Sequence, residues 1–303
     1  MKRIKEIPFL FIMICCILFA FTACDELNGI EEPFTMVIPV GEITANGLEI
    51  DTKNGGIEVY YWNESFIKVE GEKRVNGLGN LESEIEKISV NYAVHANQLH
   101  IYASFPDDMN KLFKNVSYGV SMIVYIPEET NKFSDYEMNT SNGSITLSGF
   151  DGHFDLRTSN GRVKLSRCSG SIKAKTSNGS IELSDVNGQI DITTSNGPIK
   201  FSNLFLTEST HSFDTSNGSI KGSVTFPLSG NVRLVTSNGS IDLSVPSNTA
   251  ADFVANTSNG GISINGLPVT YTSDDKTSKM GRINNGGVRL EMKTSNGSIN
   301  VAQ

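Results

Sequence analysis

The residues of this chain with the most specific chemistry are four cysteines and four histidines, and they are scattered along the sequence. Cys15 and Cys16 fall in an apolar N-terminal segment, Cys24 ends that segment, and Cys168 stands alone in the rest of the chain. A single remaining cysteine cannot close a disulfide within the chain, so we interpret Cys168 as incidental rather than as a nucleophile. The histidines show no metal-ligand spacing, and the sequence predicts no metal site, no cofactor and no catalytic residue. They are His95, His100, His153 and His211.

Cys24 is the one cysteine in a context that predicts a modification. Three basic residues among the first five precede an apolar stretch from Ile7 to Ala23, which is the order of an export signal. The stretch ends in Phe21-Thr22-Ala23-Cys24, which resembles the bacterial lipobox, where small residues precede a cysteine that receives lipid. We therefore predict a lipoprotein signal peptide over residues 1–23 and lipidation at Cys24. An uncleaved membrane anchor is the alternative, because the apolar run is just long enough to consider. In either case the bulk of the chain lies outside the cytoplasm.

The mature chain is predicted to be acidic. The whole sequence has a formal net charge of −8, and removing residues 1–23 takes away three basic residues and Glu6, which leaves 22 basic and 32 acidic residues and a net charge of −10. An acidic surface does not attract nucleic acid, so we exclude nucleic acid as a partner. Residues 24–34 are predicted to be a short tether between the lipid and the folded domain.

A tetrapeptide, Thr-Ser-Asn-Gly, recurs eight times at nearly constant spacing and must be placed by a regular fold. The start positions advance by 18 three times, then by 21 three times, and finally by 37, and a degraded copy at Thr277–Ile283 divides the last gap. A fixed period of this length is typical of a stacked repeat architecture. It argues against an ordinary enzyme, because chemistry needs a few unique residues. The copies begin at Thr140, Thr158, Thr176, Thr194, Thr215, Thr236, Thr257 and Thr294.

Each repeat consists of two units that read corner, then apolar-polar-apolar. A weaker corner such as Ser169-Gly170 lies half a repeat after Asn160-Gly161, and each corner leads into a run such as Val163-Lys164-Leu165 or Ile181-Glu182-Leu183. Strict alternation with β-branched residues predicts half-buried strands. We expect the glycine after each asparagine to supply the positive φ of a tight corner.

Outward-facing charges favour a stack of coils over an antiparallel meander. At a spacing of one full repeat, Lys164, Glu182 and Lys200 alternate in sign, as favourable cross-strand neighbours should. At half that spacing, Lys164 would face Lys173, a like-charge pair. The fold class predicted is therefore all-β: a single-stranded, β-helix-like solenoid with 18–21-residue coils of two strands each, regular over residues 140–303.

The corner asparagines are predicted to stack into a structural ladder in which each amide bonds the next, as in cross-β asparagine ladders. The alternative that we weighed is a Thr/Ser/Asn face that binds carbohydrate or ice. The predicted ladder comprises Asn142, Asn160, Asn178, Asn196, Asn217, Asn238, Asn259 and Asn296.

Residues 35–139 are β-rich without the clean period. Lys53-Asn54-Gly55-Gly56 is a diverged corner between alternating runs, and residues 81–88 could form one short helix. We expect this half to form wider, irregular coils that cap the N-terminal end of the solenoid, because open strand edges recruit other chains.

Several functional motifs are absent from the sequence. Calcium-binding nonapeptide repeats need several glycines and a recurrent aspartate per unit, whereas each unit here has one glycine and irregular aspartates. No glycine-rich phosphate loop, nucleophile elbow or cysteine pair occurs. A carbohydrate-active β-helix enzyme would need a carboxylate or basic cluster in a cleft, which folding alone could create.

The export signal, the irregular β-rich half and the Thr-Ser-Asn-Gly-Ser-Ile corners together resemble the DUF4097-type bacterial β-strand-repeat proteins, which are described as candidate adhesins. They are also similar to the head domains of autotransporter adhesins. The resemblance covers residues 35–303 and implies a repeat architecture without catalytic residues to carry over. Some relatives accompany envelope stress systems, which implies a sensory or scaffolding role by analogy.

From these observations we expect a non-enzymatic lipoprotein that acts as an adhesin-like or scaffold module. Its expected partners are the membrane, through the N-terminal lipid, and a cell-surface glycan or an envelope protein. Its expected location is the bacterial cell envelope, with the outer membrane or cell surface favoured over the inner membrane. The alternatives are a carbohydrate-active β-helix enzyme and an accessory protein of an envelope stress or signalling system.

Overall fold

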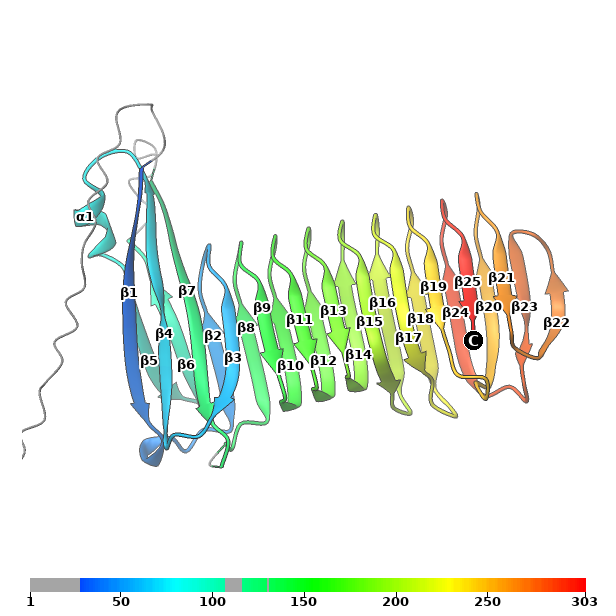
Figure 1. The fold of residues 1–303 in the computed structure, drawn as a ribbon, viewed down its shortest axis with the longest axis horizontal. Helices are drawn as coiled ribbons and strands as arrows, with labels where there is room; N and C mark the ends of the chain where they lie inside the picture. The colour runs from blue at the N-terminus through cyan, green and yellow to red at the C-terminus, as the bar shows by residue number, and fades with distance from the viewer. Residues whose placement is uncertain (1–27, 107–115, 130) are drawn as a thin grey trace, which may run out of the picture.

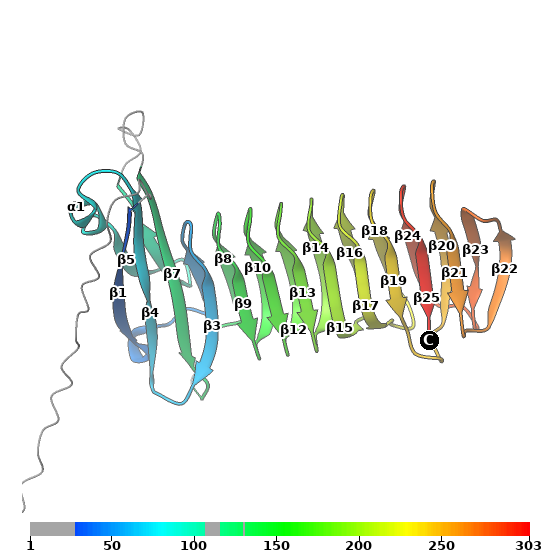
Figure 2. The same ribbon diagram turned by 45° about the horizontal axis from the view of Figure 1, so that its top comes forward.

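The computed structural model describes residues 28–303 except 107–115 and 130. The predicted signal peptide, Cys24 and the first residues of the predicted tether therefore lie outside the described residues. The described chain forms a rod of stacked β-coils whose corners line up along its edges (Figures 1 and 2). No helix among the described residues is long and apolar enough to cross a membrane.

Each regular coil gives one strand to each of two facing rows within a 25-stranded sheet. The first row contains β8 (Asp135–Asn139), β10 (Asp151–Arg157), β12 (Ser169–Lys175), β14 (Asn187–Thr194), β16 (Thr210–Thr215) and β18 (Asn231–Val235). The second row contains β9 (Ile145–Ser148), β11 (Val163–Ser166), β13 (Ile181–Ser184), β15 (Ile199–Leu206), β17 (Ile220–Thr225) and β19 (Ile241–Ser244).

Neighbouring strands in each row are parallel and in register with the repeat. Val163 pairs with Ile181 and Ile181 with Ile199, so each residue lies beside its equivalent one repeat later. The register is kept where the repeat lengthens, because Ile199 pairs with its equivalent Ile220. This register confirms the predicted solenoid and excludes the meander.

The core lies between the two rows. In β13, Ile181 and Leu183 are buried while Glu182 between them faces outward. Burying a side chain of this size stabilises a fold by about 1.5–3 kcal/mol. A single coil cannot bury these side chains completely, because its two edges would remain open to water. Stacked neighbouring coils cover these edges, so the repeats stabilise one another.

Outward charges follow the same register. Lys164, Glu182 and Lys200 occupy successive strands of the second row, and Lys173 Nζ lies 3.7 Å from Asp155 Oδ2 in the first. Lys200 faces Lys221 where the coil lengthens, and Lys221 instead forms an ion pair with the following coil.

The N-terminal half contains two coils whose order in space is the reverse of their order in the chain. One has β2 (Gly47–Asp51) and β3 (Ile57–Trp62), and the other has β6 (Gln98–Ser104) and β7 (Val116–Pro127). The β2–β3 coil lies between the β6–β7 coil and the β8–β9 coil, with parallel pairing on both sides. The first coil of the sequence is therefore an interior layer of the rod.

Antiparallel strands, rather than wider coils alone, close this end. β4 (Phe66–Gly77) pairs with β7, β1 (Asn28–Pro39) pairs with β4, and β5 (Ser89–His95) pairs with β6. The 3₁₀ helix η1 (Val40–Glu42) follows β1, and the short α-helix α1 (Leu81–Ile85) follows β4.

The predicted tether is wrong for residues 28–34, which belong to β1. Ile30 and Phe34 pack against the core, while Glu31 pairs with Arg74 at 2.5 Å and Glu32 with Lys73 at 2.9 Å. Glu31 is exposed, whereas Glu32 is half-buried on the face of β1 that Ile30 and Phe34 share, so this segment is an edge strand and not a tether.

The C-terminal end also departs from chain order. The coil of β24 (Val288–Lys293) and β25 (Ile299–Ala302) lies between the β18–β19 coil and the coil of β20 (Ala251–Asn256) and β21 (Ile262–Asn265). β23 (Ser278–Ile283) then pairs antiparallel with β20, and β22 (Val269–Asp274) pairs antiparallel with β23.

The degraded corner copy predicted at Thr277–Ile283 is consequently wrong. Lys279 and Met280 replace the Asn-Gly pair, so the corner position lacks its glycine and the segment continues as strand β23. The hairpin of β22 and β23 closes the first row of strands, as an antiparallel cap.

Candidate functional site

The corner asparagines form one continuous ladder along an edge of the rod. Each side-chain Nδ2 donates to the Oδ1 of the asparagine in the neighbouring coil, for example Asn178 to Asn160 at 2.6 Å and Asn196 to Asn178 at 2.7 Å. The ladder starts at Asn54 of the diverged corner and follows spatial order at its end, so Asn296 bonds Asn238 and Asn259 bonds Asn296. It runs through Asn54, Asn142, Asn160, Asn178, Asn196, Asn217, Asn238, Asn296 and Asn259.

The corner threonines are buried and link neighbouring coils by hydrogen bonds, so they do not form a ligand-binding face. Thr176 Oγ1 donates to Gly161 O of the neighbouring coil at 3.0 Å and accepts from the backbone N–H of Gly179 in its own corner at 3.2 Å. The corner threonines are buried, as Thr176 is with 1 % of its surface exposed. They are therefore not available for the carbohydrate or ice face that we weighed, and only the serines and asparagines of the corners face solvent.

The corner glycines are required for close approach and not for a positive φ, which corrects the prediction. None of the eight Thr-Ser-Asn-Gly glycines has a positive φ, but a Cβ on Gly179 would overlap the carbonyl of Gly161. Positive φ occurs instead at the weaker corners, as at Gly170 with a φ of 121°.

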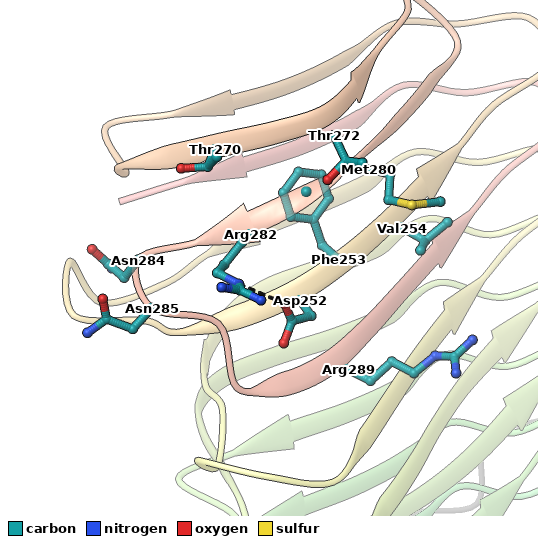
Figure 3. Close-up of a pocket in the computed structure, with 11 residues that line it drawn as sticks. Asp252, Phe253, Val254, Thr270, Thr272, Met280, Arg282, Asn284, Asn285 and Arg289 are labelled. Atoms are coloured by element: carbon teal, nitrogen blue, oxygen red, sulfur yellow. Dashed lines mark hydrogen bonds and ion pairs between the residues drawn. The ribbon is translucent and has the colours of Figure 1, made fainter.

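A groove of about 680 Å³ lies at the C-terminal end of the rod (Figure 3). It lies over the outer face of β24, β20, β23 and β22, where the antiparallel cap meets the last parallel coils. Its lining combines two guanidinium groups, amides and hydroxyls with a few apolar side chains. The side chains labelled in Figure 3 are Asp252, Phe253, Val254, Thr270, Thr272, Met280, Arg282, Asn284, Asn285 and Arg289.

The groove contains one acidic side chain among its described lining residues, and it is already engaged. Asp252 Oδ1 accepts from Arg282 Nε at 3.1 Å and Asp252 Oδ2 accepts from the backbone N–H of Gly287 at 3.1 Å. The Arg282 guanidinium and this N–H hold the pKa of Asp252 below its usual range. Arg289 of β24 is the in-register neighbour of Asp252 on the adjacent parallel strand, and no ion pair of Arg289 is found in the described part of the chain. The groove therefore offers a cation that is open to a ligand and an ionised, bonded acid.

A second cluster lies near the other end of the first row. Glu49 and Asp51 face outward from β2, and His100 of β6 pairs in register with Glu49. His100 Nε2 lies 2.8 Å from Asp51 Oδ2, and one donor atom of each of the three residues lies within 4.8 Å of the others. Burial and the neighbouring carboxylates of Asp51 and Glu137 raise the pKa of Glu49, which His100 opposes. The sequence interpretation missed this cluster because Asp51 and His100 lie far apart in the chain, on strands that are not consecutive.

His211 is a buried histidine with both ring nitrogens satisfied. Its Nδ1 accepts from the backbone N–H of Ile190 at 3.2 Å, and its Nε2 lies 2.7 Å from Thr207 O, so Nε2 carries the proton. Burial lowers the pKa of His211, because the charged imidazolium is disfavoured away from water. The residue is therefore a neutral core group.

Cys168 is buried, with 2 % of its surface exposed, and its Sγ donates to Ser166 O at 3.3 Å. Burial raises the pKa of the Cys168 thiol, which disfavours the reactive thiolate. This environment is that of a core residue. Cys24, the predicted lipidation site, lies before the first described residue.

Comparison with known proteins gives one family and several solved structures. The model of the Toastrack DUF4097 family matches residues 27–302. No curated protein sequence matches the chain.

Among solved structures, the chain is similar to a putative adhesin from Bacteroides fragilis NCTC 9343, with 12 % identity, 89 % of this chain and 97 % of that chain covered, and a TM-score of 0.45. It is similar to a putative lipid binding protein from Parabacteroides distasonis ATCC 8503, with 15 % identity, coverage of 91 % and 98 %, and a TM-score of 0.44. It is also similar to a putative cell adhesion protein from Clostridium sporogenes ATCC 15579, with 12 % identity, coverage of 91 % and 100 %, and a TM-score of 0.24.

Proposed function

The chain belongs to the Toastrack DUF4097 family, and from that premise we propose that it is a non-enzymatic, adhesin-like binding module of the bacterial cell envelope, anchored by a lipid on Cys24. The observation that carries the proposal is the groove of about 680 Å³ at the end of the rod farthest from β1. A chain anchored just before β1 would hold this groove away from the membrane.

The reach of the module follows from the stack. Parallel layers run from β7 through the regular coils to β21, and adjacent strands lie about 4.8 Å apart, so ten layers span roughly 43 Å. The layers are tied by the asparagine ladder and by parallel pairing on both rows. Because the layers are continuously paired, a force applied at the tip of the rod would be carried to its base, which suits an adhesin or scaffold.

The lining of the groove indicates an anionic, hydroxyl-rich ligand. Arg289 offers a planar guanidinium that can bind a carboxylate with two hydrogen bonds, and Asn285 and Thr272 offer donors and acceptors for hydroxyl groups. Val254 and Met280 give the groove an apolar surface for the face of a sugar ring. We therefore propose an acidic saccharide of a cell surface as the ligand.

The same lining disfavours the carbohydrate-active enzyme. Most glycoside hydrolases use a pair of carboxyl groups across the scissile bond, one of them protonated. The described residues that line this groove include one carboxyl group, Asp252, and its lowered pKa keeps it ionised. The geometry supports binding without hydrolysis.

The test is a glycan and envelope-polymer array probed with the full chain in detergent, with released products assayed in the same wells. We expect binding to acidic saccharides without product. Arg289→Ala should weaken that binding at least about tenfold, the scale of a lost charge-assisted hydrogen bond pair. Arg162→Ala, a matched removal of an exposed arginine in the middle of the rod, should leave it unchanged.

Two results would overturn the proposal. Release of product would show an enzyme, and equal binding by the Arg289→Ala and unaltered chains would remove the groove as the site. The anchor is tested separately. Metabolic labelling with a fatty-acid analogue should mark the chain, and Cys24→Ala should abolish both the label and recovery in the membrane fraction.

A further inference from the structure

The fold brings one imidazole and two carboxylates together on the outer face of the first row. Glu49 and Asp51 lie two positions apart on β2, so both point to the same side of the strand. His100 comes from β6, the parallel neighbour of β2, and the backbone pairing of these two strands places it beside Glu49. All three side chains are half-buried, so they are partly shielded from water but open to a small ion.

These donors match the ligand preferences of a transition-metal ion. Imidazole nitrogen suits zinc, copper, iron and nickel, whereas calcium and magnesium prefer oxygen alone. Zinc accepts His nitrogen at about 2.0–2.1 Å and carboxylate oxygen at about 2.0–2.2 Å. The three donor atoms lie within 4.8 Å of one another, so rotation of the side chains without backbone movement can bring them around one ion.

We propose that Glu49, Asp51 and His100 form a binding site for a divalent transition-metal ion of the zinc class. The site lies near the N-terminal end of the rod and is independent of the terminal groove and of the function proposed above. Three protein donors leave a coordination position for water or for a donor atom of a partner molecule.

A simple ion pair between His100 and Asp51 accounts for those two residues but not for Glu49. On β8, the neighbour of β2 on the other side, Glu137 pairs in register with Glu49, and Arg157 Nη1 approaches Glu137 Oε1 at 3.7 Å. Glu49 thus lies between Glu137 and the His100–Asp51 pair, with no basic side chain of its own among the described residues. A divalent cation would neutralise this crowding of carboxylates.

Zinc titration of the full chain tests the proposal. The chain, without a histidine tag, is purified in detergent, and its accessible thiols are alkylated so that no thiolate competes for the metal. Isothermal titration with Zn²⁺ is then run on the unaltered chain, on His100→Asn and on Glu49→Gln. His153→Asn is the matched control, because His153 is an exposed histidine of the same row outside the cluster.

We expect the unaltered chain and His153→Asn to bind one Zn²⁺ equally well. His100→Asn and Glu49→Gln should each bind it at least about tenfold more weakly, the lower bound for loss even of a supporting partner in a metal site. The ion should appear against these three side chains by anomalous diffraction at the zinc edge. Far-UV circular dichroism identifies a variant that has lost its fold, and the other variant then carries the comparison.

The opposite results are equally clear. Equal Zn²⁺ affinity of the unaltered chain and a folded cluster variant would overturn the proposal, as would a zinc ion found elsewhere with these donors unoccupied. A loss with His153→Asn as large as that with His100→Asn would show only general surface binding and would overturn it too.

Discussion

Replacing one corner glycine by alanine tests whether close approach of the backbones, rather than a special φ, holds the rod together. Gly179 lies in the middle of the regular coils, far from both caps. Its φ is outside the positive range, so alanine meets no intrinsic backbone strain there. The added Cβ would instead overlap the Gly161 carbonyl and lie 3.0 Å from Thr176 Oγ1.

The magnitude follows from what must move. Relieving the overlap pushes two corners apart and strains three hydrogen bonds: Gly179 N–H to Thr176 Oγ1, Thr176 Oγ1 to Gly161 O, and Thr194 Oγ1 to Gly179 O. A typical intramolecular hydrogen bond contributes about 0.5–1.5 kcal/mol, so Gly179→Ala should lower the free energy of unfolding by about 2–4 kcal/mol. The backbone carbonyl of Gly161 cannot rotate away as a flexible side chain would.

The assay is urea denaturation followed by far-UV circular dichroism, combined with hydrogen exchange of the amides in the Gly161 and Gly179 corners. Gly261→Ala is the matched control. A Cβ there meets no atom within 4 Å, and its φ is not positive. The control should change the free energy of unfolding by no more than about 0.5 kcal/mol in the destabilising direction, as at other open surface sites.

The reasoning is refuted if Gly179→Ala unfolds at the same urea concentration as the unaltered chain and keeps its exchange protection. A loss in Gly261→Ala as large as that in Gly179→Ala would also refute it, because a general entropic cost of replacing glycine would then be the cause.

Three further predictions concern buried or fixed groups. Because the folded state keeps His211 neutral while the unfolded chain protonates it near its ordinary pKa of 6.5, the free energy of unfolding should fall as the pH drops below about 6.5; urea denaturation from pH 5 to 8 should show a flatter dependence for His211→Gln. Cys168 should react with iodoacetamide at pH 8 far more slowly in the folded chain than in urea, and equal rates would contradict its burial. Asn178 and Asn238 should resist deamidation in the folded protein and deamidate readily when it is unfolded, because the ladder fixes their amides; mass spectrometry of aged samples that showed equal rates would contradict this.

The regular coils could be predicted from the sequence, because the repeat length determines which residues of neighbouring coils pair. When Val163, Ile181 and Ile199 recur once in every coil, the residue one period away is also the spatial neighbour, and the like-charge contact of Lys164 and Lys173 excludes the other register. The ladder follows from the same rule, since identical amides at one position of every coil must stack.

The two ends were not accessible because chain order and spatial order differ there. Nothing in the strand around Leu48 indicates that its neighbours are β6 and β8 rather than the next strand in the chain. The hairpin around Met280 likewise keeps an alternating pattern that fits a parallel or an antiparallel partner equally well. Periodicity fixes a strand and its buried face, but it does not choose a partner where the repeat breaks.

The candidate sites depend on those ends, and for that reason the sequence did not show them. The groove exists because β23 and β22 fold back beside Asp252, and the metal cluster exists because β6 lies beside β2. The sequence contained only part of the information. Its alternating pattern placed Glu49 and Asp51 on the outward face of one strand and His100 on the outward face of another. Only the pairing of the two strands joins them.

The insertion of the last coil between two earlier ones has a consequence for synthesis of the protein. A ribosome completes β20 to β23 before β24 and β25 emerge, so the layer of β18 and β19 and the layer of β20 and β21 both wait with an open edge for a partner that is not yet made. The tip of the rod can therefore close only after β25 has been translated, whereas the regular coils can stack as they emerge. A chain that stopped at Gly287 would lack an interior layer rather than an outer one. It would leave two strand edges with unpaired backbone groups on either side of the missing layer.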